Sequence, residues 1–204
     1  ILRYAHTPIA MLGGLWRETL EPREKDGEER PPVFILVCKN TKIAKVVHEW
    51  LAEDKPPHGV PAAGLPELVN RDGQLYTIRV DSKVVDETDT GTSKSDEDAW
   101  MRFTLDTVGK LDWPRDVQGA PVHPDGFVAL AEKLEKARGL APGALSETPP
   151  GRHVRCIVSV GMLTEGWDCN TVTHIVGLRP FMSQLLCEQV VGRALRRANY
   201  TVGD

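Results

Sequence analysis

Several common sequence features are missing from this chain. Its 204 residues contain no G-x-x-x-x-G-K-[ST] run, so the usual phosphate-cradling loop is absent. There is no C-x-x-C pair, which argues against a zinc ribbon and a disulfide scaffold; the four cysteines are Cys38, Cys156, Cys169 and Cys187. The sequence also has no signal peptide and no run of about 18 apolar residues. We therefore expect a soluble, cytoplasmic chain with reduced thiols and no membrane partner.

The composition is that of a folded domain with unevenly distributed charge. Hydrophobic residues make up 41% of the chain, which is enough for one sizeable core or for two small domains. The formal net charge is -4, but the acidic residues cluster at 18–29 and 86–98 while the last predicted helix is basic. A local basic surface for nucleic acid therefore remains compatible with the acidic total. The chain starts at Ile1 and stops soon after this helix, so we expect it to be a piece of a longer protein.

Apolar, β-branched runs alternate with helical patterns along the chain. Residues 33–38 form an uninterrupted apolar run, which is typical of a parallel strand buried on both faces. Further strands are predicted at 75–80, 154–160 and 172–176, and helices after Asn40 or Thr41, at about 96–108 and at 125–138. This alternation predicts an α/β fold, with a parallel sheet covered by helices on both faces.

The segment before the first strand is predicted to differ from the rest. Residues 1–32 combine a mixed apolar stretch, broken at Gly13-Gly14, with a charged, solvated loop over 21–30. We interpret them as a segment leading into a domain that occupies 33–204. Within that domain Asp125 is expected to cap the helix that follows it, and Gly139 to end that helix.

The first strand is followed by a turn with polar residues. Lys39-Asn40-Thr41 lies at its carboxyl end, where open α/β sheets place their ligands. Asn40 or Thr41 is expected to cap a helix whose apolar residues recur at helical spacing: Ile43, Val46, Val47, Trp50 and Leu51. Capping and phosphate contact are compatible at this turn, so both interpretations stay open.

A second polar pattern lies near the end of the chain. If a helix begins after Ser183, then Gln189, Gly192, Arg193 and Arg196 share one face of it, at spacings i, i+3, i+4 and i+7. A separate apolar stripe of Leu186, Val190 and Ala194 can dock the helix on a core. Guanidinium groups bind phosphate oxygens in pairs, and the glycine allows close approach between them. This face therefore suits a polyphosphate.

Two motifs together carry a family resemblance. Gln189-x-x-Gly192-Arg193-x-x-Arg196 resembles motif VI of superfamily 2 helicases, and Thr164-Glu-Gly-Trp-Asp168 resembles motif V. The longer run over 158–193 resembles the helicase part of type III restriction enzymes and their relatives. The resemblance implies that the domain at 33–204 is a RecA-like helicase domain, the second of the two motor domains. Lys39-Asn40-Thr41 would then belong to motif IV.

The resemblance also implies residue roles. The arginines that would reach the γ-phosphate of ATP across a cleft are Arg193 and Arg196, with Arg196 as the finger. The residues implied near the nucleotide are Gln189, Gly166, Asp168 and Gly192. The residues implied at the nucleic-acid backbone are Lys39, Asn40, Ser82, Gly161 and Thr164. Binding of DNA through such contacts would depend on salt and little on sequence.

The chain departs from a complete helicase in two motifs. It lacks the phosphate loop, and Asp96-Glu-Asp-Ala99 follows polar residues rather than the buried strand that a magnesium-binding D-E-x-x box requires. We interpret these carboxylates as a helix N-terminus and His174 as a core or surface residue rather than a ligand. ATP with Mg²⁺ would be bound mainly by an N-terminal RecA-like domain of the same protein, so the chain alone is expected to be inactive.

Other interpretations remain open. A modification subunit or a nuclease domain could accompany the motor, although the chain contains no nuclease signature. A catalytically silent helicase-fold module that binds nucleic acid or serves as a scaffold is the main alternative. A small-molecule enzyme on a doubly wound sheet has less support, because no glycine-rich turn follows the first strand.

Overall fold

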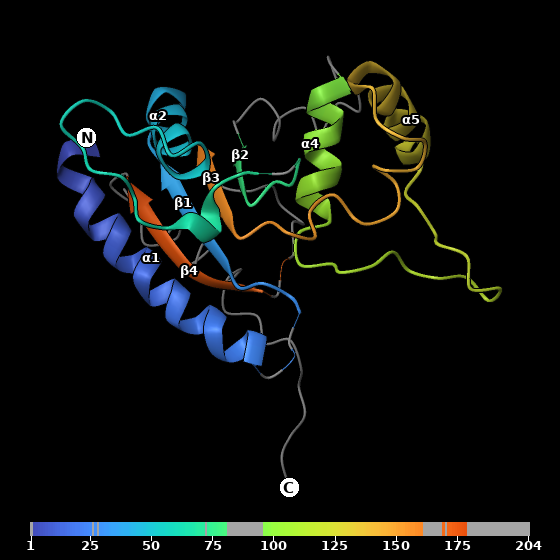
Figure 1. Cartoon of the computed structure of the whole chain (residues 1–204), viewed down its shortest axis with the longest axis horizontal. Helices are drawn as coiled ribbons and strands as arrows, with labels where there is room; N and C mark the ends of the chain where they lie inside the picture. Colours follow the sequence, from blue (N-terminus) through green and yellow to red (C-terminus); the bar gives the residue numbers. More distant parts are fainter. Residues whose placement is uncertain are drawn as a thin grey trace, which may run out of the picture.

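Four parallel strands form the centre of the structure, a computed structural model that describes residues 2–25, 27, 29–71, 73–80, 96–160, 169 and 171–178. The elements in chain order are α1 (Leu2–Lys25), β1 (Val33–Cys38), α2 (Thr41–Ala52), the short 3-10 helix η1 (Pro66–Leu68), β2 (Thr77–Val80), α4 (Asp96–Asp106), α5 (Phe127–Arg138), β3 (Cys156–Val160) and β4 (Val172–Leu178). Figure 1 shows these elements with the strands at the centre. The predicted strands are thus present, as are the predicted helices that fall within the described residues, and the helix expected after Ser183 lies outside them.

The sheet has the strand order β2-β3-β1-β4, and each pair of neighbours is parallel. Strand β1 lies between β3 and β4 and is buried along its whole length. The apolar run at 33–38 explains this position, because a strand covered on both faces needs apolar side chains at every residue. The predicted α/β, RecA-like fold is confirmed.

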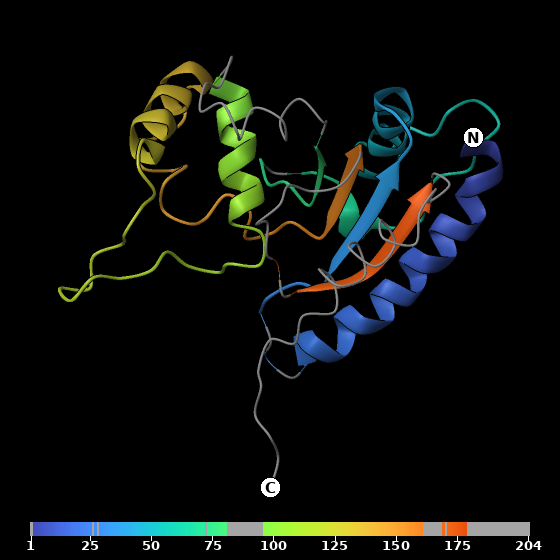
Figure 2. The ribbon, with the colours of Figure 1, turned by 180° about the vertical axis from the view of Figure 1, so that it is seen from behind.

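Helices cover both faces of the sheet. Phe34, Leu36 and Cys38 pack on the side of α1 and α2, and the alternate residues Val33, Ile35 and Val37 pack on the side of α4. Figure 2 shows α1 and α2 on one side of the strands and α4 with α5 on the other. Successive side chains of a strand point to opposite faces, so one strand supplies two cores.

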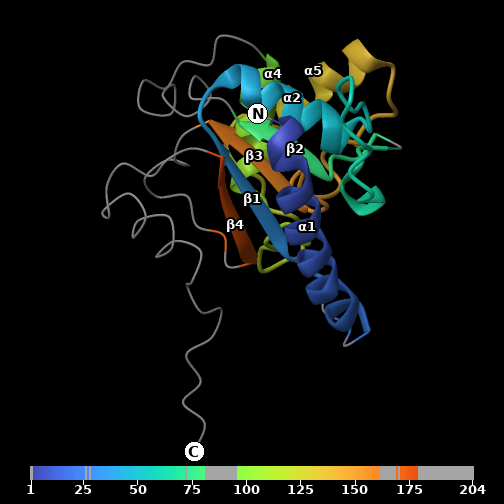
Figure 3. The same cartoon turned by 90° about the vertical axis from the view of Figure 1, so that its left-hand side faces the viewer.

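Helix α1 differs from the expectation for residues 1–32. It continues through Gly13-Gly14 and ends only at Lys25, so neither the break nor a charged loop starting at residue 21 is present. The reason is tertiary packing: α1 buries Ile9 and Trp16 in the same core as α2 and the sheet. The indole Nε1 of Trp16 also donates to the backbone carbonyl of Pro32, at 2.8 Å. Figure 3 shows α1 running alongside the strands.

Helices α4 and α5 share a small core of their own, formed by Trp100, Trp113, Phe127, Ala131 and Leu134. Helix α4 begins at Asp96, which confirms that the three acidic residues form a helix N-terminus. Two of them also reach α5, because Asp96 pairs with Lys133 at 2.6 Å and Glu97 with Arg138 at 2.8 Å.

The start of α5 corrects one expectation. Gly126, with φ +74°, precedes the helix and no side chain caps it, so Asp125 is not the cap. Glycine takes this left-handed conformation without the strain that a Cβ would add. The predicted end is confirmed, since Gly139 has φ +66° and its N–H bonds to carbonyls of the last turn.

Among the described residues, no helix is both long enough and apolar enough to cross a membrane.

Candidate functional site

The candidate site is built on the carboxyl edge of the sheet. Cys38, the last residue of β1, stands in register with Val160 of β3 on one side and with Leu178 of β4 on the other. These two residues are also the last of their strands. Three neighbouring strands therefore end at one level, and the chain leaves them at residues 39, 161 and 179.

The segments that follow these strand ends include the predicted motif residues. Lys39 and Asn40 come directly after β1, the motif V segment starts after β3, and the motif VI segment lies downstream of β4. Strand β2 ends at Val80, one neighbour further along the sheet. Of the predicted site residues, only Lys39 and Asn40 are described. Those outside the described residues are Ser82, Gly161, Thr164, Gly166, Asp168, Gln189, Gly192, Arg193 and Arg196.

Asn40 caps α2, as predicted. Its backbone is extended, with φ -157° and ψ 169°, and its Oδ1 accepts a hydrogen bond from the N–H of Ile43 at 3.0 Å. The backbone carbonyl of Asn40 accepts the first helical bond, from Ala44, at 3.1 Å. The side-chain oxygen is thus used by the helix. Asn40 remains exposed at the edge where strand β1 ends.

The N-terminus of α2 gives this edge a positive electrostatic character. The first turn contains no acidic residue, and it carries Lys42 directly after Lys39, Asn40 and Thr41. No carboxylate of the described part of the chain lies within ion-pair distance of Lys39 or Lys42. Unbonded N–H groups and the helix dipole favour an anion here. Lys42 was not among the residues predicted from the sequence. Its position two residues after the cap Asn40, in the first turn of the helix, was the signal that could have identified it.

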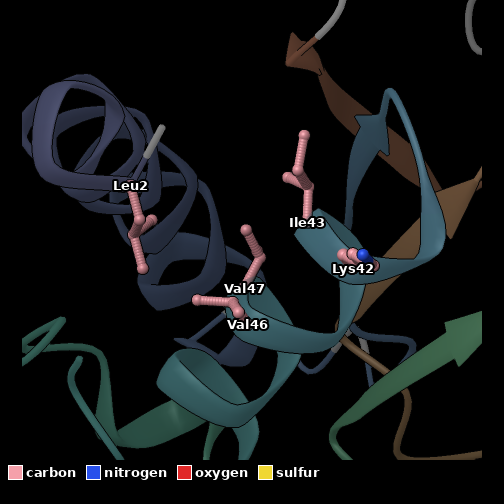
Figure 4. Close-up of a pocket in the computed structure, with 5 residues that line it drawn as sticks. All are labelled: Leu2, Lys42, Ile43, Val46 and Val47. Carbon is pink, nitrogen blue, oxygen red and sulfur yellow. The ribbon is translucent and has the colours of Figure 1, made fainter.

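A shallow groove lies beside this turn, between the start of α1 and α2. It has a volume of about 240 Å³ and is lined by Leu2, Lys42, Ile43, Val46 and Val47. Figure 4 shows Leu2 on α1 and the valines on α2 bordering it. Its walls are almost entirely apolar, and its volume lies below the range of about 300–1,000 Å³ typical of ligand pockets. The groove therefore gives no separate evidence for a nucleotide site.

Other candidate groups in the described part of the chain are structural. His174 packs edge-on against Phe34, with ring centroids 6.3 Å apart, and burial lowers its pKa. Burial also raises the pKa of Cys38 to about 12, which keeps that thiol protonated and unreactive. Within the described ranges, no group of three or more His, Cys, Asp or Glu side chains is placed to hold a metal ion. The interpretation of His174 as a core or surface residue agrees with this geometry.

No protein-family model, curated protein or solved structure matches the chain.

Proposed function

We propose that this chain is the second motor domain of an ATP-dependent DNA helicase or translocase of the type III restriction enzyme kind, acting in the cytoplasm. In this role it supplies motifs IV, V and VI. The first motor domain, in the same protein, binds most of the ATP and Mg²⁺. Closure of the two domains then brings Arg193 and Arg196 to the γ-phosphate.

The observation that supports this proposal is that β1, β3 and β4 end at the same level of the sheet. The three segments with helicase-like motifs follow β1, β3 and β4, and Cys38 is in register with both Val160 and Leu178. Ligands of open α/β sheets bind outside the carboxyl ends of the strands. The strands that precede these three segments therefore end at neighbouring points on one edge, beside the positive N-terminus of α2.

The described residues suit the phosphate groups of DNA or ATP, but not Mg²⁺. Lys39 and the N-terminal turn of α2 favour phosphate groups, which DNA and ATP both carry. We assign Mg²⁺ to the first motor domain, because this sequence has no D-E-x-x box that follows a buried strand. We assign Gln189, Gly166, Asp168 and Gly192 to the nucleotide. Lys39, Asn40, Ser82, Gly161 and Thr164 are assigned to the DNA backbone.

The finger assignment is tested in the protein that contains both motor domains. Arg196→Ala should lower DNA-stimulated ATP turnover by about 10³- to 10⁵-fold, the range for arginine fingers in other phosphoryl-transfer enzymes. Arg197→Ala is the matched control, since it removes a neighbouring arginine that the motif does not include. If Arg196→Ala left the turnover at the wild-type value, the finger assignment would be wrong.

The backbone contact is tested with the chain itself. Binding of a fluorescein-labelled, mixed-sequence single-stranded oligonucleotide is measured by anisotropy over a series of KCl concentrations. Lys39→Glu should weaken binding at every salt concentration and lower the slope of log K against log salt by about 0.7. Lys136→Glu on α5 is the control, because it makes the same charge change on a helix away from this edge. Equal slopes for Lys39→Glu and the wild type would contradict the contact.

The alternative is a catalytically silent helicase-fold module that binds nucleic acid or acts as a scaffold. It is favoured by the absence of a phosphate loop and a magnesium box from this sequence. The two proposals differ in ATP turnover. A protein that contains both motor domains and binds DNA, yet hydrolyses no ATP in its presence, would support the silent module.

A further inference from the structure

Helix α1 is apolar on two faces, and the fold covers only one of them. The residues of the covered face, which pack into the core shared with α2 and the sheet, are Leu2, Ile9, Trp16 and Leu20. The outer face carries large apolar side chains that stay exposed: Tyr4 by 89%, Met11 by 67% and Leu15 by 49%. The outer face of a surface helix normally carries polar and charged residues, and a helix that is apolar on all sides is normally buried. The outer face of α1 is therefore a candidate contact surface.

The exposed apolar residues form one stripe along α1. At about 100° per residue, Tyr4, Met11 and Leu15 fall within an arc of about 40°, and the exposed Pro8 and Pro22 lie in or beside this arc. At a rise of about 1.5 Å per residue, this α1 stripe of five residues is about 27 Å long. Figures 1 and 3 show α1 as an outer layer beside the strands. Single exposed apolar residues are ordinary, whereas a stripe along one helix face is typical of a helix that packs against another element.

Charged residues of opposite sign flank the two ends of the α1 stripe. Arg3 lies next to its first residue, and Glu18 and Glu21 lie near its other end, on the same side of the stripe as Arg3. All three are exposed, and none of them has an ion-pair partner among the described residues. Arg3 Nη2 donates to the carbonyl of His58 at 3.5 Å, which is longer than an ordinary hydrogen bond. The other guanidinium N–H groups of Arg3 make no hydrogen bond within the described part of the chain.

A second copy of α1 that runs antiparallel to the first is complementary to this arrangement. If Tyr4 of one copy faces Leu15 of the other, then Pro8 faces Met11, and apolar residues meet along the contact. In this register Arg3 is two residues, or about 3 Å along the axis, from the level of Glu18 in the other copy, which is within reach of an arginine side chain. A two-fold axis brings the same side of both helices together, so each ion pair forms twice. A parallel pair would instead place like charges together.

We propose that the α1 stripe is the contact surface of a homodimer, in which α1 packs antiparallel against α1 of a second copy of this chain. The contact buries the apolar stripe of both copies and joins Arg3 of each copy to Glu18 of the other. Such an interface is closed, so association stops at two copies. A contact confined to one pair of helices is at the small end of specific interfaces, so we expect a reversible dimer with a micromolar dissociation constant. The proposal goes beyond the proposed motor function and does not depend on it, because it uses only the geometry and charges of α1.

Sedimentation equilibrium of the chain at about 1 to 300 µM measures the dissociation constant. Leu15→Lys should raise this constant by about 100-fold or more, because it removes two symmetric apolar contacts and adds a charge to each. Leu15 lies on the outer face and lysine is a good helix former, so the variant should fold, which circular dichroism checks. Val117→Lys is the matched control, since Val117 is an apolar residue that is 99% exposed and lies outside α1. It should leave the dissociation constant unchanged.

Reversal of single charges tests the antiparallel register. Arg3→Glu brings like charges together at both ends of the contact, and so does Glu18→Arg, so each variant should dimerise about 10-fold more weakly than the wild type. In an equimolar mixture each variant supplies the charge that the other has lost. The mixture should therefore form a heterodimer with about the affinity of the wild type.

The outcomes decide between this dimer and other uses of the α1 stripe. A wild type that stays monomeric throughout the concentration range overturns the proposal. A dimer that Leu15→Lys leaves intact uses another surface and overturns it as well, and a mixture of the charge variants without rescue overturns the antiparallel pairing. If Leu15→Cys is protected from maleimide in a monomeric protein that contains both motor domains, a neighbouring domain covers the stripe and the proposal is wrong.

Discussion

Gly151 lies where the loop before β3 crosses the end of α4, and replacing it with alanine should destabilise the domain. The backbone N–H of Gly151 donates to Thr107 Oγ1 at 2.9 Å. A Cβ at this position would lie 2.5 Å from the N of Val108 and 2.6 Å from the carbonyl carbon of Thr107, and closer still to the O of Thr104. All three atoms belong to the backbone at and just after the end of α4, so no side-chain rotation can relieve the contact.

The expected magnitude follows from two contributions. Overpacking of a buried site costs about 1–3 kcal/mol, and the displaced hydrogen bond to Thr107 costs about 1 kcal/mol more. The total of about 2–4 kcal/mol would lower Tm by about 4–16 °C for a domain of this size. Gly14→Ala is the matched control, because a Cβ there has no atom within 4 Å and the position lies inside α1. Alanine should stabilise that helix by up to about 1 kcal/mol.

Urea denaturation followed by tryptophan fluorescence measures both changes. Gly151→Ala should shift the midpoint to lower urea while the m-value stays the same, and Gly14→Ala should shift it slightly the other way. A change of less than about 0.5 kcal/mol for Gly151→Ala, which is ordinary for surface substitutions, would refute the reasoning. It would mean that the loop before β3 can move away from α4 at little cost.

Three further predictions concern buried polar groups. The Glu135 carboxylate is 3% exposed and accepts the N–H groups of Gly143 and Leu145, at 3.0 and 2.8 Å, so Glu135→Gln should lower the unfolding free energy by about 1–3 kcal/mol in urea denaturation. The pKa of His48 is lowered from 6.5 in the folded protein, mainly by burial and then by the charge of Arg79. The neutral imidazole therefore contributes to stability above pH 6.5, and this contribution is lost as the pH falls through the lower pKa of the folded state. The unfolding free energy of the wild type should therefore decrease on acidification, His48→Gln should flatten part of that decrease, and identical pH profiles would contradict the assignment. The Cys38 thiol, whose pKa burial raises to about 12, should resist iodoacetamide in the folded protein and react in urea, as read by mass spectrometry of the labelled peptide.

Local patterns predicted the central elements well. The bounds of β1 agree with the apolar run at 33–38, and Asn40 caps α2 because its side chain can accept the N–H of Ile43 without any help from distant residues. The acidic start of α4 was distinguished from a magnesium box by the polar residues before it. Each of these inferences depends on residues within a few positions of one another, and such interactions are readable in the sequence.

The expectation that failed for α1 depends on contacts from elsewhere in the fold, whereas the one that failed for α5 depends on a local turn. Gly13-Gly14 predicts a helix break, but Trp16 and Ile9 bury enough surface against the sheet to hold α1 together through both glycines. Asp125 is a good cap by residue type, yet the chain enters α5 through the left-handed turn at Gly126. The outcome for α1 does not follow from propensity, because tertiary packing overrides differences of about 1 kcal/mol per residue. The turn before α5 is local, since the N–H of Phe127 donates to the carbonyl of Pro124 at 3.1 Å.

The sequence by itself determined the fold class, the strand buried on both faces and the motif residues from which a function can be proposed. These follow from residue type and spacing along a short stretch of chain. The tertiary structure alone decided that β1, β3 and β4 end at one level, and that one face of α1 is buried while Tyr4, Met11 and Leu15 stay exposed. Strand order and register arise from packing between residues distant in the chain, and no local pattern encodes which distant side chains that packing brings together.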